Sequence, residues 1–374
     1  MKKRIRVAIL FGGKSAEHEV SLQSAKSIVE ALDTEKYEPI LVGIDKSGRW
    51  LLPDQSNSLL HTGDPKLIKL NKGADSVALV PQSNGVLLNM TQNKKGPTVD
   101  VVFPALHGPF GEDGTTQGLL KLANVPFVGA GVLGSAVGMD KDVQKRLLKE
   151  ARIRVARFSV FHSGETVDAK TVAEEFGLPL FVKPANLGSS VGITKVKKTD
   201  ELSGAIQRAL QYDRKVLVEE CIDGREIECA VLGNDHPQAS VPGEVIVHDD
   251  FYSYEAKYVD EHGAALEIPA KIPAEIAATL QRLALTTFAV LGCEGMARVD
   301  FFLKPGGEVL VNELNTIPGF TKISMYPKLW EASGMPYPEL IDRLIQLAIE
   351  RFEKEQKLKT SYETEIGHVM RNGL

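Results

Sequence analysis

Carboxylate and amide side chains recur on a segment that the sequence predicts to be a β-hairpin. Residues 297–314 contain two apolar runs, and Pro305-Gly306-Gly307 between them favours a tight turn. Asp300 lies on the first run, and Glu313 and Asn315 lie two residues apart at the end of the second. Because residues i and i+2 of a strand share a face, these side chains can converge on a hard cation such as Mg²⁺ or Mn²⁺. The alternative is a solvated hairpin edge.

A lysine followed by a loop of small residues occurs near the middle of the chain. Lys183 ends an apolar run, and residues 186–192 read Asn-Leu-Gly-Ser-Ser-Val-Gly. Small residues let backbone N–H groups approach phosphate oxygens, and the lysine adds a positive charge. The segment therefore predicts a site for a nucleotide triphosphate. The alternative is an ordinary turn, since the G-x-x-x-x-G-K-[ST] pattern of P-loop proteins is absent.

The segment His-Gly-Pro-Phe-Gly-Glu-Asp-Gly at 107–114 follows a predicted buried strand. Open α/β sheets bind ligands at the carboxyl ends of their strands, where a carboxylate can meet an ammonium group. We therefore expect a substrate site here. His107 either contacts the substrate or holds the loop through hydrogen bonds, and the residues alone leave both roles open.

Residues 251–258 bring together three tyrosines, a glutamate and Lys257 between two acidic clusters. This segment is predicted to be either an edge strand or a mobile lid. The lid interpretation requires Lys257 to face a phosphate.

The elements that must position these residues follow from hydrophobic periodicity. A short strand, a Gly-Gly loop, a helical pattern and a second strand occupy the first 45 residues, which predicts a βαβ unit with a parallel sheet. Residues 53–97 are polar and loop-rich, and we expect an elaboration of this unit there. Beyond residue 135 strands and helices follow an α+β pattern. Strands are predicted at 180–183, 191–196, 215–219, 226–232, 297–303 and 308–314, and helices at 140–150, 200–211, 273–291 and 337–352.

Length and charge exclude several classes of protein. A chain of 374 residues favours two or three domains. The 44 Lys and Arg against 49 Asp and Glu give a net charge of −5, so no footprint for nucleic acid or an anionic membrane is present. No run approaches the roughly 18 apolar residues of a membrane helix, and the first apolar stretch is too short for a signal peptide, so we expect a cytoplasmic protein. The three cysteines form no C-x-x-C pair and are expected to be small buried apolar side chains.

Several blocks, taken together and in order, resemble the D-alanine–D-alanine ligases of the ATP-grasp superfamily. The blocks are 12–21, 107–114, 183–192, 255–258, 298–300 and 312–319, and the resemblance runs from about residue 4 to residue 350. It implies ATP-dependent joining of two D-alanines for peptidoglycan synthesis, in a homodimer. The implied fold is an N-terminal parallel α/β domain at 1–135 followed by a two-domain ATP-grasp fold. Its central subdomain covers 136–225, its C-terminal catalytic domain covers 226–352, and 353–374 form a tail.

The resemblance also implies roles for single residues. The expected contacts to ATP come from Lys141 and Lys183 at the phosphates, Glu219, Cys221 and Ile222 at the adenine, Glu226 at the ribose, and Ser190. Two Mg²⁺ or Mn²⁺ ions are expected on Asp300, Glu313 and Asn315, in agreement with the hairpin argument. The two D-alanines are expected at Glu17 and His107 for the first and at Ser324 and Met325 for the second. Catalytic roles are implied for Glu17, Ser189 and Tyr258, which together hold the lid, for Lys257, and for Arg298 and Gly319 at the oxyanion.

Three alternatives stay open. A ligase that uses D-lactate or D-serine as its second substrate shares most of these blocks, although Tyr258 favours D-alanine. Another ATP-grasp enzyme, such as a carboxylase, shares the nucleotide site. A Rossmann dehydrogenase is disfavoured, because Gly12-Gly13 lacks the G-x-G-x-x-G spacing. Pro109-Phe110 departs from the family pattern and bears on the shape of the first substrate site.

Overall fold

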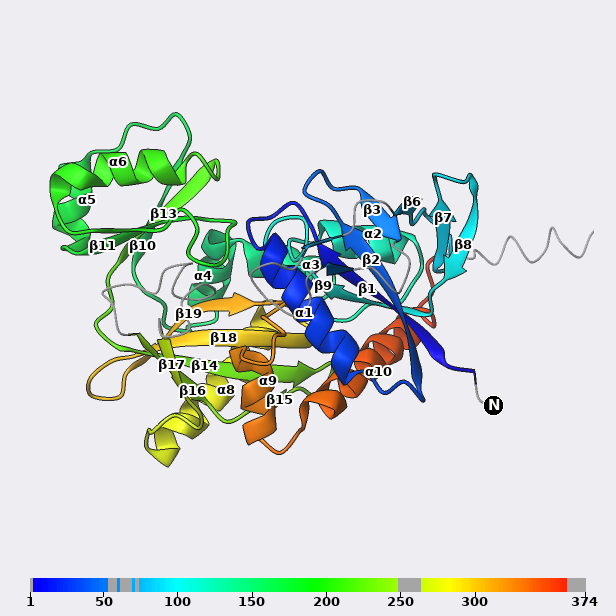
Figure 1. Cartoon of the computed structure of the whole chain (residues 1–374). Helices are drawn as coiled ribbons and strands as arrows, with labels where there is room; N and C mark the ends of the chain where they lie inside the picture. Colours follow the sequence, from blue (N-terminus) through cyan, green and yellow to red (C-terminus); the bar gives the residue numbers. More distant parts are fainter. Residues whose placement is uncertain (1–2, 53–58, 61–68, 71–73, 248–263, 362–374) are drawn as a thin grey trace, which may run out of the picture.

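The computed structural model describes residues 3–52, 59–60, 69–70, 74–247 and 264–361. Its strands form three larger sheets, of seven, four and six strands, in order along the chain. A short ladder of β4 (Leu59–Leu60) with β5 (Lys69–Leu70) lies apart from them. Figure 1 shows the four-stranded sheet and its helices as a lobe at the upper left. None of the helices in the described ranges has the length and apolar character that a bilayer span requires.

The N-terminal sheet is mixed, whereas the sequence predicted a parallel one. β1 (Ile5–Gly12) pairs in parallel with β2 (Tyr37–Ile44) on one side and β9 (Val101–Ala105) on the other. Antiparallel strands extend it beyond β2 in the order β3 (Trp50–Leu52), β6 (Asp75–Ala78), β7 (Val86–Asn89) and β8 (Lys94–Thr98). Helix α1 (His18–Ala31) connects β1 to β2, which confirms the βαβ unit, and α2 (Thr115–Leu122) and α3 (Val132–Met139) follow β9.

Strands β6, β7 and β8 occupy part of the segment 53–97 that was expected to be loop-rich. Each is four or five residues long, and on β7 only Leu87 and Asn89 are buried. Such short strands with one buried face contain too few apolar residues for a clear periodic signal.

The middle of the chain forms the antiparallel four-stranded sheet, whose order is β10-β13-β11-β12. These strands are β10 (Phe158–His162), β13 (Lys215–Glu220), β11 (Leu180–Pro184) and β12 (Thr194–Val196). Helices α5 (Ala169–Phe176) and α6 (Thr199–Ala209) bury their apolar sides against it, and α4 (Lys141–Glu150) leads into this lobe. β12 is shorter than the predicted strand at 191–196, because left-handed residues occupy the segment before it.

The C-terminal sheet has the order β17-β16-β14-β18-β19, with β15 also paired to β14. Its strands are β14 (Arg225–Gly233), β15 (Gln238–Ala239), β16 (Gly243–Val247), β17 (Ala264–Glu267), β18 (Gly295–Leu303) and β19 (Val309–Asn315). The predicted hairpin is confirmed, since β18 and β19 pair antiparallel. The helices of this part are α8 (Ala274–Val290), α9 (Met325–Ala332) and α10 (Tyr337–Glu355).

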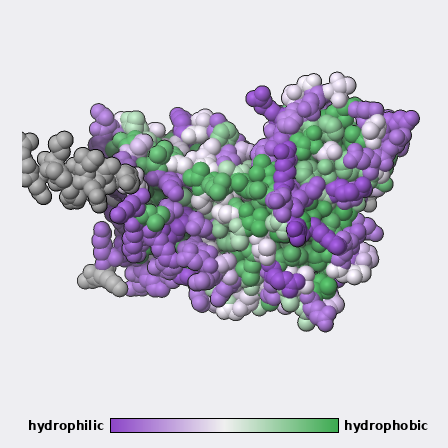
Figure 2. All heavy atoms as spheres, turned by 180° about the vertical axis from the view of Figure 1, so that it is seen from behind, coloured by the Kyte–Doolittle hydropathy of each residue, from purple (hydrophilic) through white to green (hydrophobic). Residues whose placement is uncertain are grey.

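One apolar core joins the N-terminal sheet and α1 to α9, α10 and the C-terminal sheet, whereas the four-stranded sheet has a core of its own. Phe103 of β9 and Phe320 meet edge to face across the shared core, with ring centroids 5.7 Å apart. Figure 2 shows from behind a band of apolar residues across the middle of the molecule. The predicted boundary at 135 lies inside α3, so we propose that the N-terminal unit extends to Met139. The boundary at 225 coincides with the first residue of β14.

Candidate active site

A cavity of about 380 Å³, here the larger cavity, lies between the four-stranded sheet and the C-terminal sheet. Its walls come from β11 and β13 on one side and from β14, β16, β18 and β19 on the other. All seven residues expected at ATP line it: Lys141, Lys183, Ser190, Glu219, Cys221, Ile222 and Glu226. The cavity therefore brings together residues that lie up to 85 positions apart (226 − 141).

Buried charges at one end of this cavity suit an anionic ligand. Glu219 is 1% exposed, and its carboxylate lies 2.6 Å from Nζ of Lys183 and 3.2 Å from Nζ of Lys145. Burial acts to raise the pKa of Glu219, but the two lysines outweigh it and keep that pKa below its ordinary value. Two ammonium groups therefore surround one carboxylate at this end of the cavity, and lysine ammonium groups are suited to binding phosphate oxygens.

The same charge cluster affects the two lysines differently. Burial lowers the pKa of Lys145, and its partner Glu219 does not fully compensate. For Lys183 burial acts in the same direction, but Glu219 outweighs it and the pKa is raised. Lys183 lies closer to Glu219 and is also attracted by Glu313 and Glu226, whereas Lys145 is repelled by Lys183. Lys183 is therefore the more firmly charged of the two.

Lys141 adds a third cation from the start of α4. Its ammonium donates a hydrogen bond to the carbonyl of Leu187 at 2.5 Å and lies 3.5 Å from Glu313. It thus joins the loop at 186–192, here called the Gly-Ser loop, to β19, which carries the expected metal ligands Glu313 and Asn315.

The Gly-Ser loop has a backbone that non-glycine residues rarely adopt. Ser189 and Ser190 have φ of 50° and 60°, in the left-handed region. Gly188 packs so closely on Glu17 that an added Cβ would lie 3.2 Å from its carboxylate. The hydroxyl of Ser189 donates to that same carboxylate, a contact between residues 172 positions apart. The loop is therefore held against the N-terminal unit.

A second cavity of about 150 Å³, here the smaller cavity, adjoins the larger one. Gly188, Ser189 and Glu313 are among the residues that line both. The expected substrate and catalytic residues that line the smaller cavity are Glu17, His107, Ser189, Arg298, Gly319, Ser324 and Met325. The two cavities thus place a candidate acid-binding site beside a candidate phosphate site.

Arg298 and residues of the segment 319–325 both line the smaller cavity. The Arg298 guanidinium pairs with both oxygens of Asp300 at 2.7 Å and lies 2.9 Å from Glu228. Gly319 packs on Ser324, where an added Cβ would come within 2.8 Å of the hydroxyl. Ser324 is the N-cap residue of α9, and the N-terminal end of a helix attracts a carboxylate.

His107 is buried, and both of its ring nitrogens have protein partners. Nδ1 lies 3.0 Å from the carbonyl of Ile317, and Nε2 lies 3.1 Å from the hydroxyl of Ser24. A carbonyl can only accept, so Nδ1 carries the proton, and burial keeps the pKa of the ring below its ordinary value. This geometry favours the loop-holding role over hydrogen bonding to the substrate.

Asp300, Glu313 and Asn315 lie on one face of the β18–β19 hairpin. Asp300 is paired directly with Glu313, and the amide of Asn315 donates to Asp300 at 2.9 Å. Two carboxylates and an amide oxygen are the donor set that Mg²⁺ or Mn²⁺ prefers. In the described part of the chain no cluster of three His, Cys, Asp or Glu side chains is suited to a metal, so the amide of Asn315 is needed to complete this set.

Two buried residues of this site were missed by the sequence analysis. Lys145 lies one turn after Lys141 on the same face of α4, and this spacing was an available signal. Glu112 lines the smaller cavity and accepts hydrogen bonds from the N–H groups of Gly108 at 2.7 Å and Ile317 at 3.2 Å. Burial raises the pKa of Glu112 to about 8, and the nearby charge of Glu17 acts in the same direction.

Cys221 departs from the expectation of a buried apolar side chain. It is half-buried and lines the larger cavity, whereas Cys229 and Cys293 are buried as expected. Lys257 and Tyr258 lie outside the described residues.

Comparison with known proteins identifies relatives over nearly the whole chain. Residues 6–130 match the family model "D-ala D-ala ligase N-terminus", and residues 147–346 match "D-ala D-ala ligase C-terminus". The D-alanine–D-alanine ligase of Oceanobacillus iheyensis is 55% identical over 96% of this chain and 99% of its own length.

Solved structures agree with these matches. The D-alanine–D-alanine ligase of Coxiella burnetii superposes with a TM-score of 0.84 at 41% identity, over 95% of this chain and 96% of its own. The VanG D-Ala:D-Ser ligase of Enterococcus faecalis superposes with a TM-score of 0.80 at 39% identity, over 92% of this chain and 100% of its own.

Proposed function

The chain belongs to the D-alanine–D-alanine ligase family, and on this premise we propose how its residues carry out the family's reaction. The reaction uses ATP to join two D-alanine molecules and releases D-alanyl-D-alanine, ADP and phosphate, for peptidoglycan synthesis. The carboxylate of the first D-alanine accepts the γ-phosphoryl group, and the amine of the second then displaces phosphate from this acyl phosphate. The protein must hold three molecules in contact and exclude water from the intermediate.

The observation that carries the proposal is the contact between the two cavities. They share Gly188, Ser189 and Glu313, so a nucleotide in the larger cavity and an amino acid in the smaller one would meet there. Phosphoryl transfer depends mainly on positioning and electrostatic stabilisation, and this junction supplies both.

The nucleotide is proposed to lie along the larger cavity with its phosphates at Lys141, Lys183 and Ser190. Glu226 is the proposed partner of the ribose. Glu219 near the end of β13, and Cys221 and Ile222 directly after this strand, are proposed for the adenine end. Since the carboxylate of Glu219 already pairs with two lysines, its contribution there is to hold Lys183 in place.

Asp300, Glu313 and Asn315 are the proposed ligands of two Mg²⁺ or Mn²⁺ ions, because their oxygens fit hard divalent cations. When bound, such ions neutralise phosphate charge. Lys257 is proposed to add a further positive charge to the γ-phosphate. Tyr258 is proposed to close the site with Ser189 and Glu17.

The smaller cavity is proposed to hold both D-alanines. Glu17 attracts the ammonium of the first, and the N-terminus of α9 at Ser324 and Met325 attracts the carboxylate of the second. Arg298 and the N–H of Gly319 are proposed to stabilise the oxyanion that forms when the amine attacks.

We also propose that the enzyme works as a cytoplasmic homodimer. The large apolar side chains Leu122 on α2 and Leu133 on α3 are exposed, and the two helices contact each other. Sedimentation of the purified protein would test this, and a monomer at all concentrations would contradict it.

A D-serine-using ligase is the second candidate, because the VanG structure superposes over nearly the same length. The experiment is to supply Mg²⁺-ATP and D-alanine, alone or with D-serine or D-lactate, and to measure phosphate release and product mass. We expect D-alanyl-D-alanine as the main product, with L-alanine inactive as the stereochemical control. An excess of D-alanyl-D-serine or D-alanyl-D-lactate would assign the enzyme to the ligases that use D-serine or D-lactate as the second substrate.

A further inference from the structure

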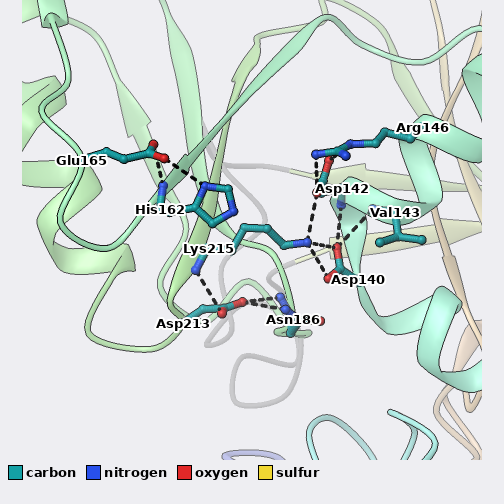
Figure 3. A network of polar contacts seen from close by, with 9 residues as sticks. All are labelled: Asp140, Asp142, Val143, Arg146, His162, Glu165, Asn186, Asp213 and Lys215. Atoms are coloured by element: carbon teal, nitrogen blue, oxygen red, sulfur yellow. Dashed lines mark hydrogen bonds and ion pairs between the residues drawn. The ribbon is translucent and has the colours of Figure 1, made fainter.

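We propose that residues 213–215, which lead into β13 and are here called the start of β13, position both of the segments that would bind the ATP phosphates. One segment is the N-terminus of α4 with Lys141, and the other is the Gly-Ser loop that begins at Asn186. The inference rests on the proposed function, in which Lys141 and this loop contact ATP. Figure 3 shows Lys215 reaching to the start of α4 while Asp213 lies beside Asn186.

The first set of contacts, here the first arm, joins Lys215 to the N-terminus of α4. Its ammonium lies 2.7 and 2.8 Å from the two oxygens of Asp140 and 3.0 Å from Asp142. Asp140 is the N-cap of α4 and accepts hydrogen bonds from the N–H groups of Asp142 and Val143, each at 3.1 Å. Because Lys141 is the residue directly after the cap, the position of its backbone depends on Asp140.

The second set of contacts, here the second arm, joins Asp213 to the first residue of the Gly-Ser loop. One oxygen of its carboxylate accepts hydrogen bonds from the backbone N–H of Asn186 at 2.7 Å and from the side-chain amide of Asn186 at 3.0 Å. The other oxygen accepts from the N–H of Lys215 at 3.2 Å. The first residue of the Gly-Ser loop is thus attached to the same strand end that holds α4.

Backbone hydrogen bonds connect the two arms. The N–H of Ala185 donates to the carbonyl of Lys215, and the N–H of Lys141 donates to the carbonyl of Ala185, each at 3.0 Å. A displacement of the start of β13 therefore moves Lys141 and the loop together. Asp140, Asp213 and Lys215 are absent from the described lining of both cavities, so they act through other residues.

Charge balance explains why Lys215 cannot be replaced by an apolar residue without movement. Within the described part of the chain it is the cation common to Asp140 and Asp142, and there Arg146 pairs with Asp142 alone, at 2.6 and 3.0 Å. Burial works against the charge of Lys215, but its bonds to the two aspartates outweigh this and raise its pKa. Without this ammonium, two neighbouring carboxylates would repel each other at the first turn of α4.

The test compares steady-state kinetics of Lys215→Met with those of Lys215→Arg and Arg146→Met. Misplacement of a binding group costs up to about 100-fold, so we expect Lys215→Met to raise the KM for ATP by about 10- to 100-fold. The KM for D-alanine should rise less than the KM for ATP, since Glu17, Arg298 and Ser324 supply most of that site and only Gly188 and Ser189 of the Gly-Ser loop are shared. Lys215→Arg retains the charge and should restore most of the ATP affinity.

Arg146→Met is the matched control, because it also removes a cation from Asp142 but leaves Asp140 bound to Lys215. Its side chain is 66% exposed, and we expect an unchanged KM for ATP. An equal rise in this control, or equal rises in both KM values for Lys215→Met, would show a general loss of stability and overturn the inference. Asp213→Leu removes both acceptor oxygens at similar side-chain volume and serves as the second variant if Lys215→Met does not fold; a wild-type KM for ATP in Asp213→Leu would also overturn the inference.

Lys141→Met separates this inference from the proposed function. A wild-type KM for ATP in Lys141→Met would contradict the role of Lys141 itself. A raised KM in Lys141→Met together with a wild-type KM in Lys215→Met would contradict only the positioning role of β13.

Discussion

Glu112 is the carboxylate whose protonation should most strongly link stability to pH. It is buried between the N-terminal unit and the segment at Ile317, and one oxygen faces the N–H of Gly108 while the other faces the N–H of Ile317. Burial raises its pKa from 4.5 to about 8. The perturbation is Glu112→Gln, which retains the shape of the side chain and removes its titration.

The sign follows from the raised pKa. Between pH 4.5 and 8 the folded protein keeps the Glu112 proton while the unfolded chain has released it. The free energy of unfolding of the wild type therefore falls by about 1.4 kcal/mol per pH unit in this window. From pH 5.5 to pH 7.5 the loss is about 3 kcal/mol (2 × 1.4), and the Gln variant does not share it.

Glu112→Gln also loses a hydrogen bond, which lowers its free energy of unfolding at every pH. Gln offers one acceptor oxygen, so either Gly108 or Ile317 loses its partner, which costs about 1–3 kcal/mol. We expect the wild type to be the more stable protein at pH 4.5, where this loss begins, and the difference to vanish or reverse by pH 7.5.

Urea unfolding of the ligand-free proteins, followed by circular dichroism, measures this difference across the pH range. Glu339→Gln on the exposed side of α10 is the control for removing a carboxylate outside the buried site. A Glu112→Gln difference that is constant with pH would refute the raised pKa and the reasoning from burial.

Three further changes test other parts of the molecule. Altering a residue that only supports a metal ligand costs roughly 10- to 100-fold in activity, so Asp300→Asn should lower kcat by more than this. Circular dichroism should show an intact fold, and a near-normal kcat would remove Asp300 from the proposed ligands. Tyr258→Phe should raise ATP hydrolysis relative to dipeptide formation, measured as the ratio of phosphate to D-alanyl-D-alanine, and an unchanged ratio would argue against its role in closure. Arg351→Met should lower the free energy of unfolding by about 3 kcal/mol, because the buried guanidinium donates hydrogen bonds to the carbonyls of Gly129 at 2.6 Å and Phe127 at 2.8 Å. A decrease below about 1 kcal/mol, measured by urea unfolding, would contradict this.

Local patterns were sufficient where the interacting residues are close in the chain. Two apolar runs and the turn at 305–307 predicted the β18–β19 hairpin and the convergence of Asp300 with Glu313, and the structure pairs these two residues directly. The βαβ start of the chain was predicted for the same reason, since a strand, a loop and a helix each have a local signature. The antiparallel extension by β6 to β8 was not, because its short strands bury few apolar side chains.

The sequence by itself therefore determined the elements, the donor set on the hairpin and, through the family blocks, the candidate residues. Only the tertiary structure decided how they meet: the contact of Ser189 with Glu17, the pairing of Glu219 with Lys145, and the choice of partners for His107. These contacts form when three separate sheets pack, and the free energy that holds them comes from apolar burial spread over many distant side chains. A pattern within one segment cannot predict the total of so many distant contacts. The arrangement of charges at the larger cavity and its junction with the smaller cavity could therefore be seen only in the tertiary structure.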